Sequence, residues 1–168
     1  FTINNAAASA LNVVAKGVEK VYDGAASAVS VTAIDGAKVE YSTDNQTWST
    51  TAPAYTDVVD TTVYYRVSKA GYDTATGSVK VKITEADITG FEVKAADTAK
   101  FDGNEKSSAT VTVGTPADAK ITFKVGNDTF NEVPKFTEVG TYEVSYTISK
   151  DGYNDVTGSY EFTIEKGE

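Results

Sequence analysis

The chain has 168 residues, with 24 acidic and 15 basic side chains and a formal net charge of −9, so phosphate backbones are repelled and nucleic acid is not an expected partner. Cysteine and histidine are both absent, which excludes disulfides and thiolate catalysis and removes the commonest general base and transition-metal ligand. No run of about 20 apolar residues occurs, so membrane insertion is not expected.

The first ten residues are predicted to precede the first complete domain. Residues 1–4 read FTIN and are similar to residues 162–165, which read FTIE. We interpret residues 1–10 as the end of a preceding repeat and an alanine-rich linker, and the chain as a segment of a longer tandem array. Residues 1–4 could alternatively insert as a strand into a neighbouring molecule.

Short alternating segments then predict the opening strands of two domains. The apolar residues of these segments are Leu11, Val13 and Ala15 in the first half of the chain, and Phe91, Val93 and Ala95 in the second. An aromatic residue followed by Asp-Gly comes next in both halves, at residues 22–24 and 101–103. Asp-Gly is a turn signal, because Asp bonds to its own downstream backbone and Gly accepts positive φ.

Further along the chain, two polar segments are predicted to be hairpin tips, at residues 44–46 and 126–128. An aromatic residue follows each tip, Trp48 in the first half and Phe130 in the second. Pro53 and Pro134 then interrupt the strand pattern, which indicates an edge or a crossover between two sheets.

The longest similarity between the halves links residues 56–83 with residues 137–164, which align without a gap. Such internal self-similarity indicates a repeated structural unit. Each copy is predicted to hold two strands joined by a Lys-x-Gly-Tyr turn. The inward-facing residues are expected to be Val63, Tyr65 and Val67 in one copy, and Val144, Tyr146 and Ile148 in the other.

No segment keeps a helical period for ten residues, and turn signals recur every 8 to 12 residues. This pattern is typical of an all-β protein made of small antiparallel sandwiches. We therefore predict two domains, at residues 11–85 and 86–168, in a monomeric chain. The four-residue segment 84–87 between the last strand of one copy and the first of the next should limit bending.

The quoted motifs give the chain a family resemblance. The sequence YDG at residues 22–24, VEYS at 39–42 before Trp48, and VYYRVSKAGY at 63–72 resemble bacterial immunoglobulin-like repeats, and most closely the YDG/MBG-type repeats of cell-surface proteins. Copy two departs from the pattern at Phe101 and Phe123. The resemblance implies tandem immunoglobulin-like β-sandwiches, export to the bacterial cell surface, and a non-catalytic role as a spacer or adhesive stalk beside neighbouring repeats.

Aromatic positions offer the first candidate site. Three tyrosines of copy one are replaced by phenylalanine in copy two, which predicts core packing; the pairs are Tyr22/Phe101, Tyr41/Phe123 and Tyr55/Phe136. Trp48, Tyr64 and Arg66 differ, because copy two carries Phe130, Ser145 and Thr147 in their places. An exposed Trp beside Tyr64 and Arg66 could bind a glycan or a host surface protein, which is the alternative function.

Carboxylates are the remaining chemical groups of interest. Glu85 and Asp87 could supply oxygen ligands to a calcium ion at the junction between the domains. No other cofactor is expected, and no pair of matched carboxylates or activated nucleophile predicts a catalytic residue. An enzyme is therefore the least favoured class.

Overall fold

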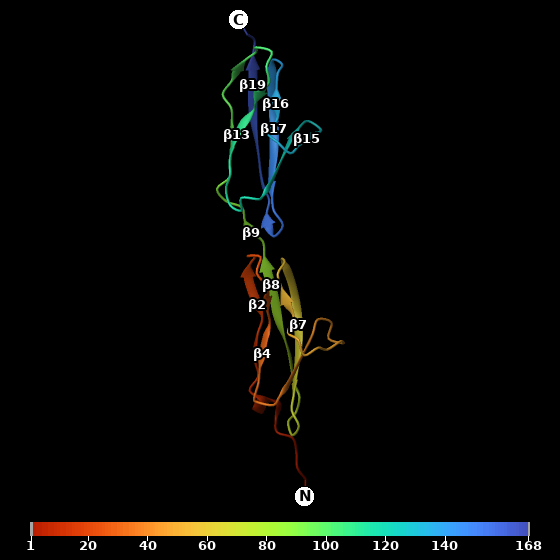
Figure 1. Ribbon diagram of the computed structural model, residues 1–168. Coiled ribbons are helices and arrows are strands. Elements are labelled where there is room, and N and C mark those ends of the chain that lie inside the picture. Colours follow the sequence, from red (N-terminus) through yellow and green to blue (C-terminus); the bar gives the residue numbers. More distant parts are fainter. Residues whose placement is uncertain (1, 168) are drawn as a thin grey trace. The chain divides into compact units, whose positions relative to one another are not determined.

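A computed structural model describes residues 2–167, which divide into two compact units with a boundary between residues 85 and 86 (Figure 1). The helical structure among these residues is the 3₁₀ helix η1, Ala8–Leu11, and none of them belongs to a helix long and apolar enough to cross a membrane. The strands of unit 1 are β1 Val14–Lys16, β2 Val18–Val21, β3 Ser27–Ala28, β4 Ser30–Thr32, β5 Lys38–Ser42, β6 Ala54–Tyr55, β7 Val59–Ser68 and β8 Ala75–Thr84.

Unit 2 repeats this series with additions. Its strands are β9 Ala86–Asp87, β10 Glu92–Ala95, β11 Ala99–Lys100, β12 Lys106–Ser107, β13 Ala109–Thr112, β14 Lys120–Val125, β15 Asp128–Phe130, β16 Lys135–Phe136, β17 Gly140–Ser149, β18 Tyr153–Asn154 and β19 Val156–Glu165.

Unit 1 is a sandwich of two layers. One layer is the sheet β2-β8-β7-β5, in which β7 is antiparallel to both β8 and β5, whereas β2 runs parallel to β8. The antiparallel pairs β1-β4 and β3-β6 form the opposite layer. The chain therefore changes layers between β1 and β2, β2 and β3, β4 and β5, β5 and β6, and β6 and β7. Pro53 lies in the crossover from β5 to β6, directly before Ala54, as the sequence predicts.

Unit 2 has the same arrangement with a wider main sheet. The order is β11-β19-β17-β14-β15, with β11 parallel to β19, and the pairs β10-β13 and β12-β16 lie opposite. The extra strand β15 arises because Gly126 and Asn127 close a two-residue hairpin, with Gly126 at φ 58°. The corresponding loop of unit 1 instead makes an isolated bridge between Tyr41 and Ser49.

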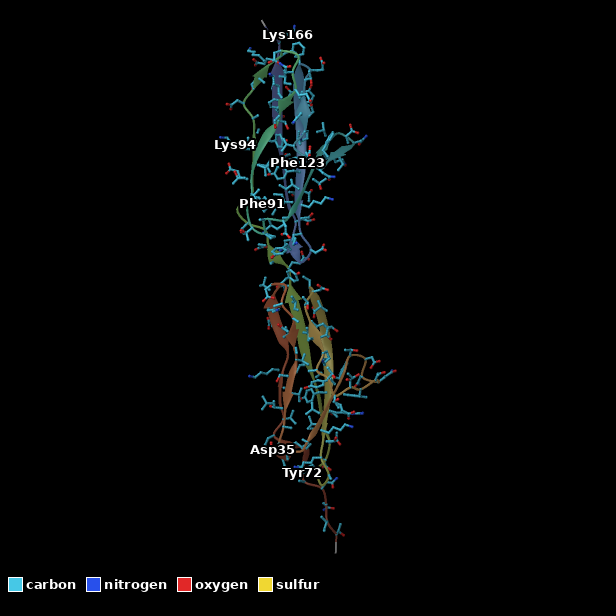
Figure 2. All side chains as sticks on the ribbon, in the orientation of Figure 1. Asp35, Tyr72, Phe91, Lys94, Phe123 and Lys166 are labelled. Atoms are coloured by element: carbon cyan, nitrogen blue, oxygen red, sulfur yellow. The ribbon has the colours of Figure 1, made fainter. Side chains whose placement is uncertain are left out.

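Apolar side chains from both layers meet in the interior of each unit. In unit 1 the core contains Val29 and Val31 from one layer and Val63, Val67 and Val81 from the other. Phe123, labelled in Figure 2, is 2% exposed and occupies the corresponding place in unit 2, where it is the counterpart of Tyr41. Burial of each such aliphatic or aromatic side chain contributes ~1.5–3 kcal/mol relative to its exposure.

The glycine that β8 and β19 share follows from a close ring contact. Tyr65 lies opposite Gly77 in the β7-β8 register, and a Cβ atom at Gly77 would lie 2.3 Å from the Tyr65 hydroxyl oxygen. Tyr146 and Gly158 repeat this arrangement at 2.3 Å in unit 2. The glycine leaves room for the tyrosine ring to lie across the neighbouring strand.

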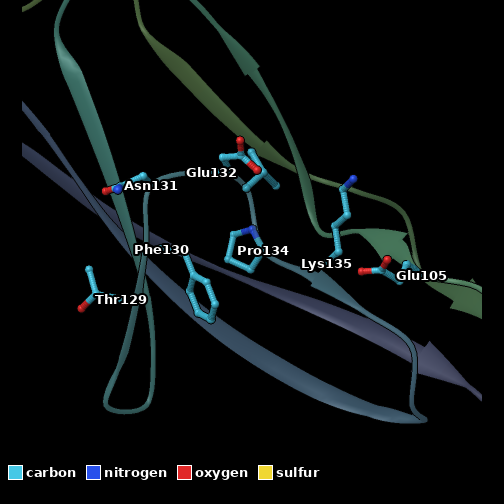
Figure 3. Close-up of a pocket in the computed structure, with 8 residues that line it drawn as sticks. Glu105, Thr129, Phe130, Asn131, Glu132, Pro134 and Lys135 are labelled. Carbon is cyan, nitrogen blue, oxygen red and sulfur yellow. The ribbon is translucent and has the colours of Figure 1, made fainter.

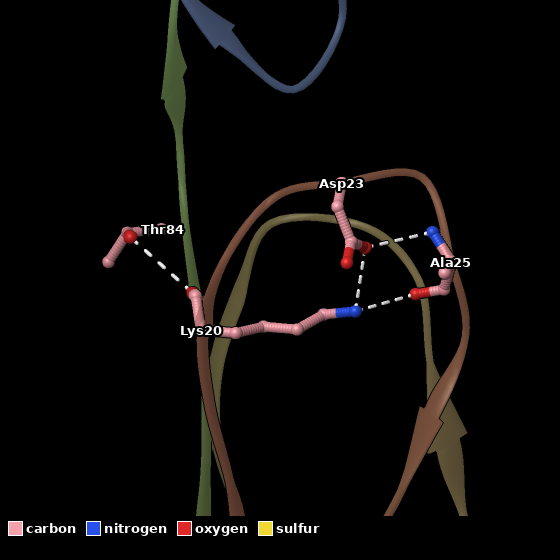
Figure 4. A network of polar contacts seen from close by, with 4 residues as sticks. All are labelled: Lys20, Asp23, Ala25 and Thr84. Atoms are coloured by element: carbon pink, nitrogen blue, oxygen red, sulfur yellow. Dashed lines mark hydrogen bonds and ion pairs between the residues drawn. The ribbon is translucent and has the colours of Figure 1, made fainter.

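The Asp-Gly turns have the capping role that the sequence predicts. Asp23 Oδ1 accepts the backbone N–H of Ala25 at 2.9 Å and the Lys20 ammonium at 2.7 Å, and Lys20 also reaches the Ala25 carbonyl (Figure 4). Gly24 follows with φ 77°. These bonds lower the pKa of Asp23, the lysine bond most strongly.

Three details differ from the sequence-based expectations. Leu11 lies in η1 rather than in the opening strand, which starts at Val14; it is fully buried because the 3₁₀ turn directs it into the core. Phe101 is 38% exposed rather than a core residue, since β11 ends before it. Two-residue strand β9 pairs in parallel with β18, a contact without a sequence signal.

Candidate ligand-binding site

The candidate site lies on the outer face of the unit 1 sheet β2-β8-β7-β5. Val63 and Val67 of β7 are fully buried, so the intervening residues Tyr64 and Arg66 point to the opposite face, as strand alternation predicts. The β5-β7 register places Glu40 directly opposite Arg66. We call the surface formed by Glu40, Trp48, Tyr64 and Arg66 the aromatic face of unit 1.

An ion pair fixes the guanidinium of this face. Arg66 Nε donates to Glu40 Oε1 at 2.9 Å, while the Lys38 ammonium lies 3.7 Å from Glu40 Oε2. The hydrogen bond from Arg66, followed by the positive charges of Arg66 and Lys38, lowers the pKa of Glu40. The Glu40 side chain is 15% exposed, so the pair is partly shielded from water. The carboxylate and guanidinium are both charged at neutral pH.

Trp48 extends this pair with an aromatic ring. The guanidinium carbon of Arg66 lies 4.3 Å from the Trp48 ring centroid, within the range of a cation–π contact. Trp48 is half-buried. The next residue, Ser49, exchanges two backbone hydrogen bonds with Tyr41, at 2.7 and 2.9 Å, so the base of the Trp48 side chain is held against β5.

The loop before Trp48 is organised by one carboxylate. Asp44 Oδ1 accepts the backbone N–H groups of Gln46 at 2.8 Å and Thr47 at 2.7 Å, and the hydroxyl of Ser42 at 2.9 Å. These bonds, that from Thr47 most strongly, lower the pKa of Asp44 to about 2. The loop is therefore ordered by side-chain to backbone bonds and brings Trp48 to the face.

Trp48 and Tyr64 also border a shallow hollow of about 370 Å³. This volume lies in the lower part of the ~300–1,000 Å³ range of ligand clefts. The β7-β8 register places Ser78 opposite Tyr64 and Thr76 opposite Arg66, and both hydroxyl-bearing residues are exposed. The remaining lining residues are Asn45, Tyr65 and Gly77.

Unit 2 lacks this combination at the same places. Ser145 and Thr147 stand where unit 1 has Tyr64 and Arg66, and Phe130 is 39% exposed on β15. A different pocket of about 720 Å³ borders Phe130, with Glu105 and Lys135 among its lining residues (Figure 3). The two units therefore share a fold but not a surface.

The structure brings together the three aromatic and basic residues that the sequence singles out, and it adds Glu40. No sequence motif identifies Glu40. Its place opposite Arg66 follows from the β5-β7 register, in which the half-buried Val39 pairs with the buried Val67, and the sequence does not give this register. Ser78 and Thr76 were missed for the same reason, because cross-strand neighbours are set by register.

The two predicted calcium ligands lie on either side of the unit boundary. Glu85 is exposed at the end of unit 1, and Asp87 is exposed in β9 of unit 2. Asp87 Oδ1 accepts a hydrogen bond from the Asn154 side-chain amide at 3.0 Å. No group of three or more metal-ligating carboxylates occurs among residues 2–167, and calcium binding by Glu85 and Asp87 stays a prediction.

Three aspartates form ion pairs with lysines that stabilise the local structure. The pKa of each of three such aspartates is lowered chiefly by a hydrogen bond from a lysine ammonium; the pairs are Asp23 with Lys20, Asp102 with Lys106, and Asp118 with Lys150. The lowered pKa extends the ionised state of each of these carboxyl groups to more acidic pH, and each carboxylate caps a turn or pairs with a neighbouring lysine.

No protein-family model matches the sequence, and neither does any curated protein. Among solved structures, the I-band fragment I67-I69 from titin matches 89% of this chain and 63% of its own, at 9% identity and a TM-score of 0.37. The insect immune protein hemolin matches 92% of this chain and 46% of its own, at 8% identity and a TM-score of 0.39. Immunoglobulin domains 1-5 of Sidekick-1 match 92% of this chain and 38% of their own, at 12% identity and a TM-score of 0.40.

The present chain thus spans less than two thirds of each of these structures. The strand order found in each of its units, two antiparallel layers with a first strand that changes sheets, is that of an immunoglobulin-like sandwich. The chain is an all-β protein with two tandem immunoglobulin-like domains.

Proposed function

We propose that this chain is a pair of structural modules from an extracellular bacterial surface protein, acting as a spacer or adhesive stalk without catalysis. The observation that carries the proposal is the parallel pairing of an early strand with the last strand in each unit. In unit 1, Val18–Val21 pairs with Val81–Thr84. In unit 2, Ala99 and Lys100 pair with Ile164 and Glu165.

Parallel pairing of these strands suits a protein under tension. When force pulls the start of a unit away from its end, parallel strands slide along each other, so their hydrogen bonds are loaded together. An antiparallel pair pulled from one end separates one bond at a time. Backbone bonds of 2.8 Å extend both patches, from Tyr22 N to the Thr84 carbonyl and from Phe101 N to the Glu165 carbonyl.

Composition supports the same proposal. The net charge of −9 favours solubility at a crowded surface, and the absence of cysteine makes the fold independent of the redox conditions outside the cell. The resemblance to bacterial surface repeats supports the location, and neighbouring repeats of the same polypeptide are the proposed partners.

A cassette experiment tests the spacer function. The two units would be placed between a cell-wall anchor and a reporter adhesin on a bacterial surface, and capture of a receptor-coated bead would be measured. Deletion of the pair should reduce capture, and an unrelated pair of immunoglobulin-like domains should restore it. If the unrelated pair fails while display of the reporter is unchanged, the role is not that of a spacer.

Ligand binding is the second candidate function, and the aromatic face of unit 1 favours it. Trp48, Tyr64 and Arg66 meet there although unit 2 retains none of them. A purely structural role does not require this difference, because unit 2 forms the same sandwich with Phe130, Ser145 and Thr147.

A further inference from the structure

We propose that the aromatic face of unit 1 binds a neutral glycan, with a sugar ring seated in the hollow beside Trp48 and Tyr64. The inference deepens the second candidate function and rests on it. The ligand class follows from three features of the face: its aromatic surface, its fixed polar groups and its charge.

The aromatic surface suits the apolar side of a sugar ring. Trp48 and Tyr64 border the hollow from two different segments, the loop after β5 and the strand β7. Both rings are half-buried, so part of each is in contact with solvent. Aromatic rings with few rotatable bonds offer a large contact area at a low entropic cost, which suits recognition of a sugar's C–H groups.

The polar groups around the rings are fixed before a ligand arrives. Glu40 holds the Arg66 guanidinium at 2.9 Å, and Trp48 covers it at 4.3 Å. Arg66 does not line the hollow itself, and its N–H groups that do not face Glu40 are suited to the hydroxyls of a sugar that extends beyond the hollow. The exposed hydroxyls of Thr76 and Ser78 lie across the hollow on β8. Such fixed groups reduce the entropy that is lost on binding.

Charge selects a neutral sugar over an acidic one. Arg66 is already paired with Glu40, and the second cation near this carboxylate, Lys38, is matched in number by Asp44 of the loop before Trp48, so these four groups carry no net positive charge. The whole chain carries a net charge of −9, which disfavours the approach of sialylated or uronic glycans. Neutral hexoses and N-acetylhexosamines carry no carboxylate, so neither of these charge effects opposes their binding.

Unit 2 supplies the substitutions for a matched test. Tyr64→Ser and Arg66→Thr introduce the residues that unit 2 carries at these places, and its β17 strand shows that they are compatible with the fold. The control variant changes Ser145→Ala and Thr147→Ala in unit 2. Because Trp48 is the only tryptophan, its fluorescence reports ligand binding at this face directly.

The experiment uses the full chain on an array of neutral and sialylated glycans, followed by calorimetric and fluorescence titration with the neutral oligosaccharides that bind. We expect binding to neutral glycans with a change in Trp48 emission. The double variant Y64S/R66T should lose at least tenfold in affinity, as truncation of central contacts does, while the unit 2 control retains it. Thermal unfolding by circular dichroism verifies that both variants are folded.

Four results would overturn the inference. Binding that is unchanged in Y64S/R66T would move the site elsewhere and leave the second candidate function intact. A preference for sialylated glycans would refute the ligand class. A glycoprotein that carries the bound glycan would serve as a further ligand, and equal binding before and after its enzymatic deglycosylation would identify a protein epitope. No binding to any glycan would refute both the inference and glycan binding as a function, without affecting the spacer test.

Discussion

At the scale of single residues, the two units fill one core position in different ways. Val29 in unit 1 is buried, and Val79 packs against its cluster. The corresponding position in unit 2 holds Ser108, fully buried, whose hydroxyl donates to the Pro134 carbonyl at 2.7 Å and lies 2.8 Å from the Tyr160 hydroxyl. Burial raises the pKa of Tyr160. A hydrogen-bonded pair thus replaces an apolar pair.

This exchange predicts a non-additive pair of mutations. Ser108→Ala should destabilise unit 2 by about 1 kcal/mol, because the Pro134 carbonyl and the Tyr160 hydroxyl each lose a hydrogen-bond partner. The double change of Ser108→Val with Tyr160→Val recreates the apolar pair of unit 1, and we expect it to cost less than the sum of the single changes by ~0.5–3 kcal/mol. Denaturant titration measures each variant, with the exposed change Ser159→Ala as the control. Additive costs would mean that the two side chains are not coupled.

Asp44 provides a prediction of pH dependence. Its pKa is about 2 in the folded chain and 3.8 in the absence of the fold, so the folded state holds the ionised form more strongly. The resulting stabilisation is complete above the unfolded value and is lost as the pH falls through about 2. Carboxyl NMR titration should place the Asp44 pKa near 2. In an Asp44→Ala variant, this part of the acid dependence of unfolding should disappear. An NMR titration midpoint near 3.8 for Asp44 in the wild type would refute the capping role.

At the scale of the elements, the change of layers between β1 and β2 depends on one glycine. Gly17 lies where the chain leaves the β1-β4 pair and joins β8, and a Cβ atom there would lie 2.0 Å from the Lys80 carbonyl oxygen. Two non-bonded atoms cannot lie this close together, so β2 must move away from β8 if any side chain is added at Gly17. This small residue thereby keeps the parallel strand pair in place.

Gly17→Ala should accordingly weaken the parallel pair. We expect a loss of about 1–3 kcal/mol in the stability of unit 1, as for other steric insertions, and Trp48 fluorescence follows the unfolding of this unit. Lys82→Ala, an exposed change on β8, should stay within about 0.5 kcal/mol. Wild-type stability of the Gly17→Ala variant would show that β2 is not held closely against β8.

The elements that could be predicted from the sequence are those with local determinants. The long strands β7 and β17 follow from alternating apolar residues, and the turns at Asp23 and Asp102 from Asp-Gly chemistry. Short strands such as β9 have too few residues for a periodic signal and depend on a partner far along the chain, here β18. The exposure of Phe101 escaped prediction for a related reason, because a ring is buried only if other segments cover it.

The candidate site could likewise be predicted only in part. Trp48, Tyr64 and Arg66 were visible in the sequence because copy two lacks them, and strand alternation placed Tyr64 and Arg66 on one face. Glu40 was not visible, because its role depends on the register between β5 and β7. Comparison of the two copies therefore identified what is specific to unit 1, whereas the geometry required the strand pairing.

At the scale of the whole molecule, the two units have separate hydrophobic cores. Phe123, Val144, Ile148 and Phe162 are buried within unit 2, while the unit 1 cluster draws only on residues from Leu11 to Ile83. Each unit also has its own parallel pair between an early and the last strand. The pair is longer in unit 1, with four residue pairs against two, so unit 1 should resist force better.

The most direct measurement is the force–extension curve of the full chain pulled from its two ends. We expect two separate unfolding steps, each of which lengthens the chain by about 25 nm, because about 80 residues at ~3.3–3.6 Å per extended residue span ~26–29 nm, less the few nanometres between the ends of a folded unit. The step that is lost or weakened in Gly17→Ala should be the one at higher force. A single step of about twice this length, or gradual extension at low force without steps, would contradict two self-contained mechanical units.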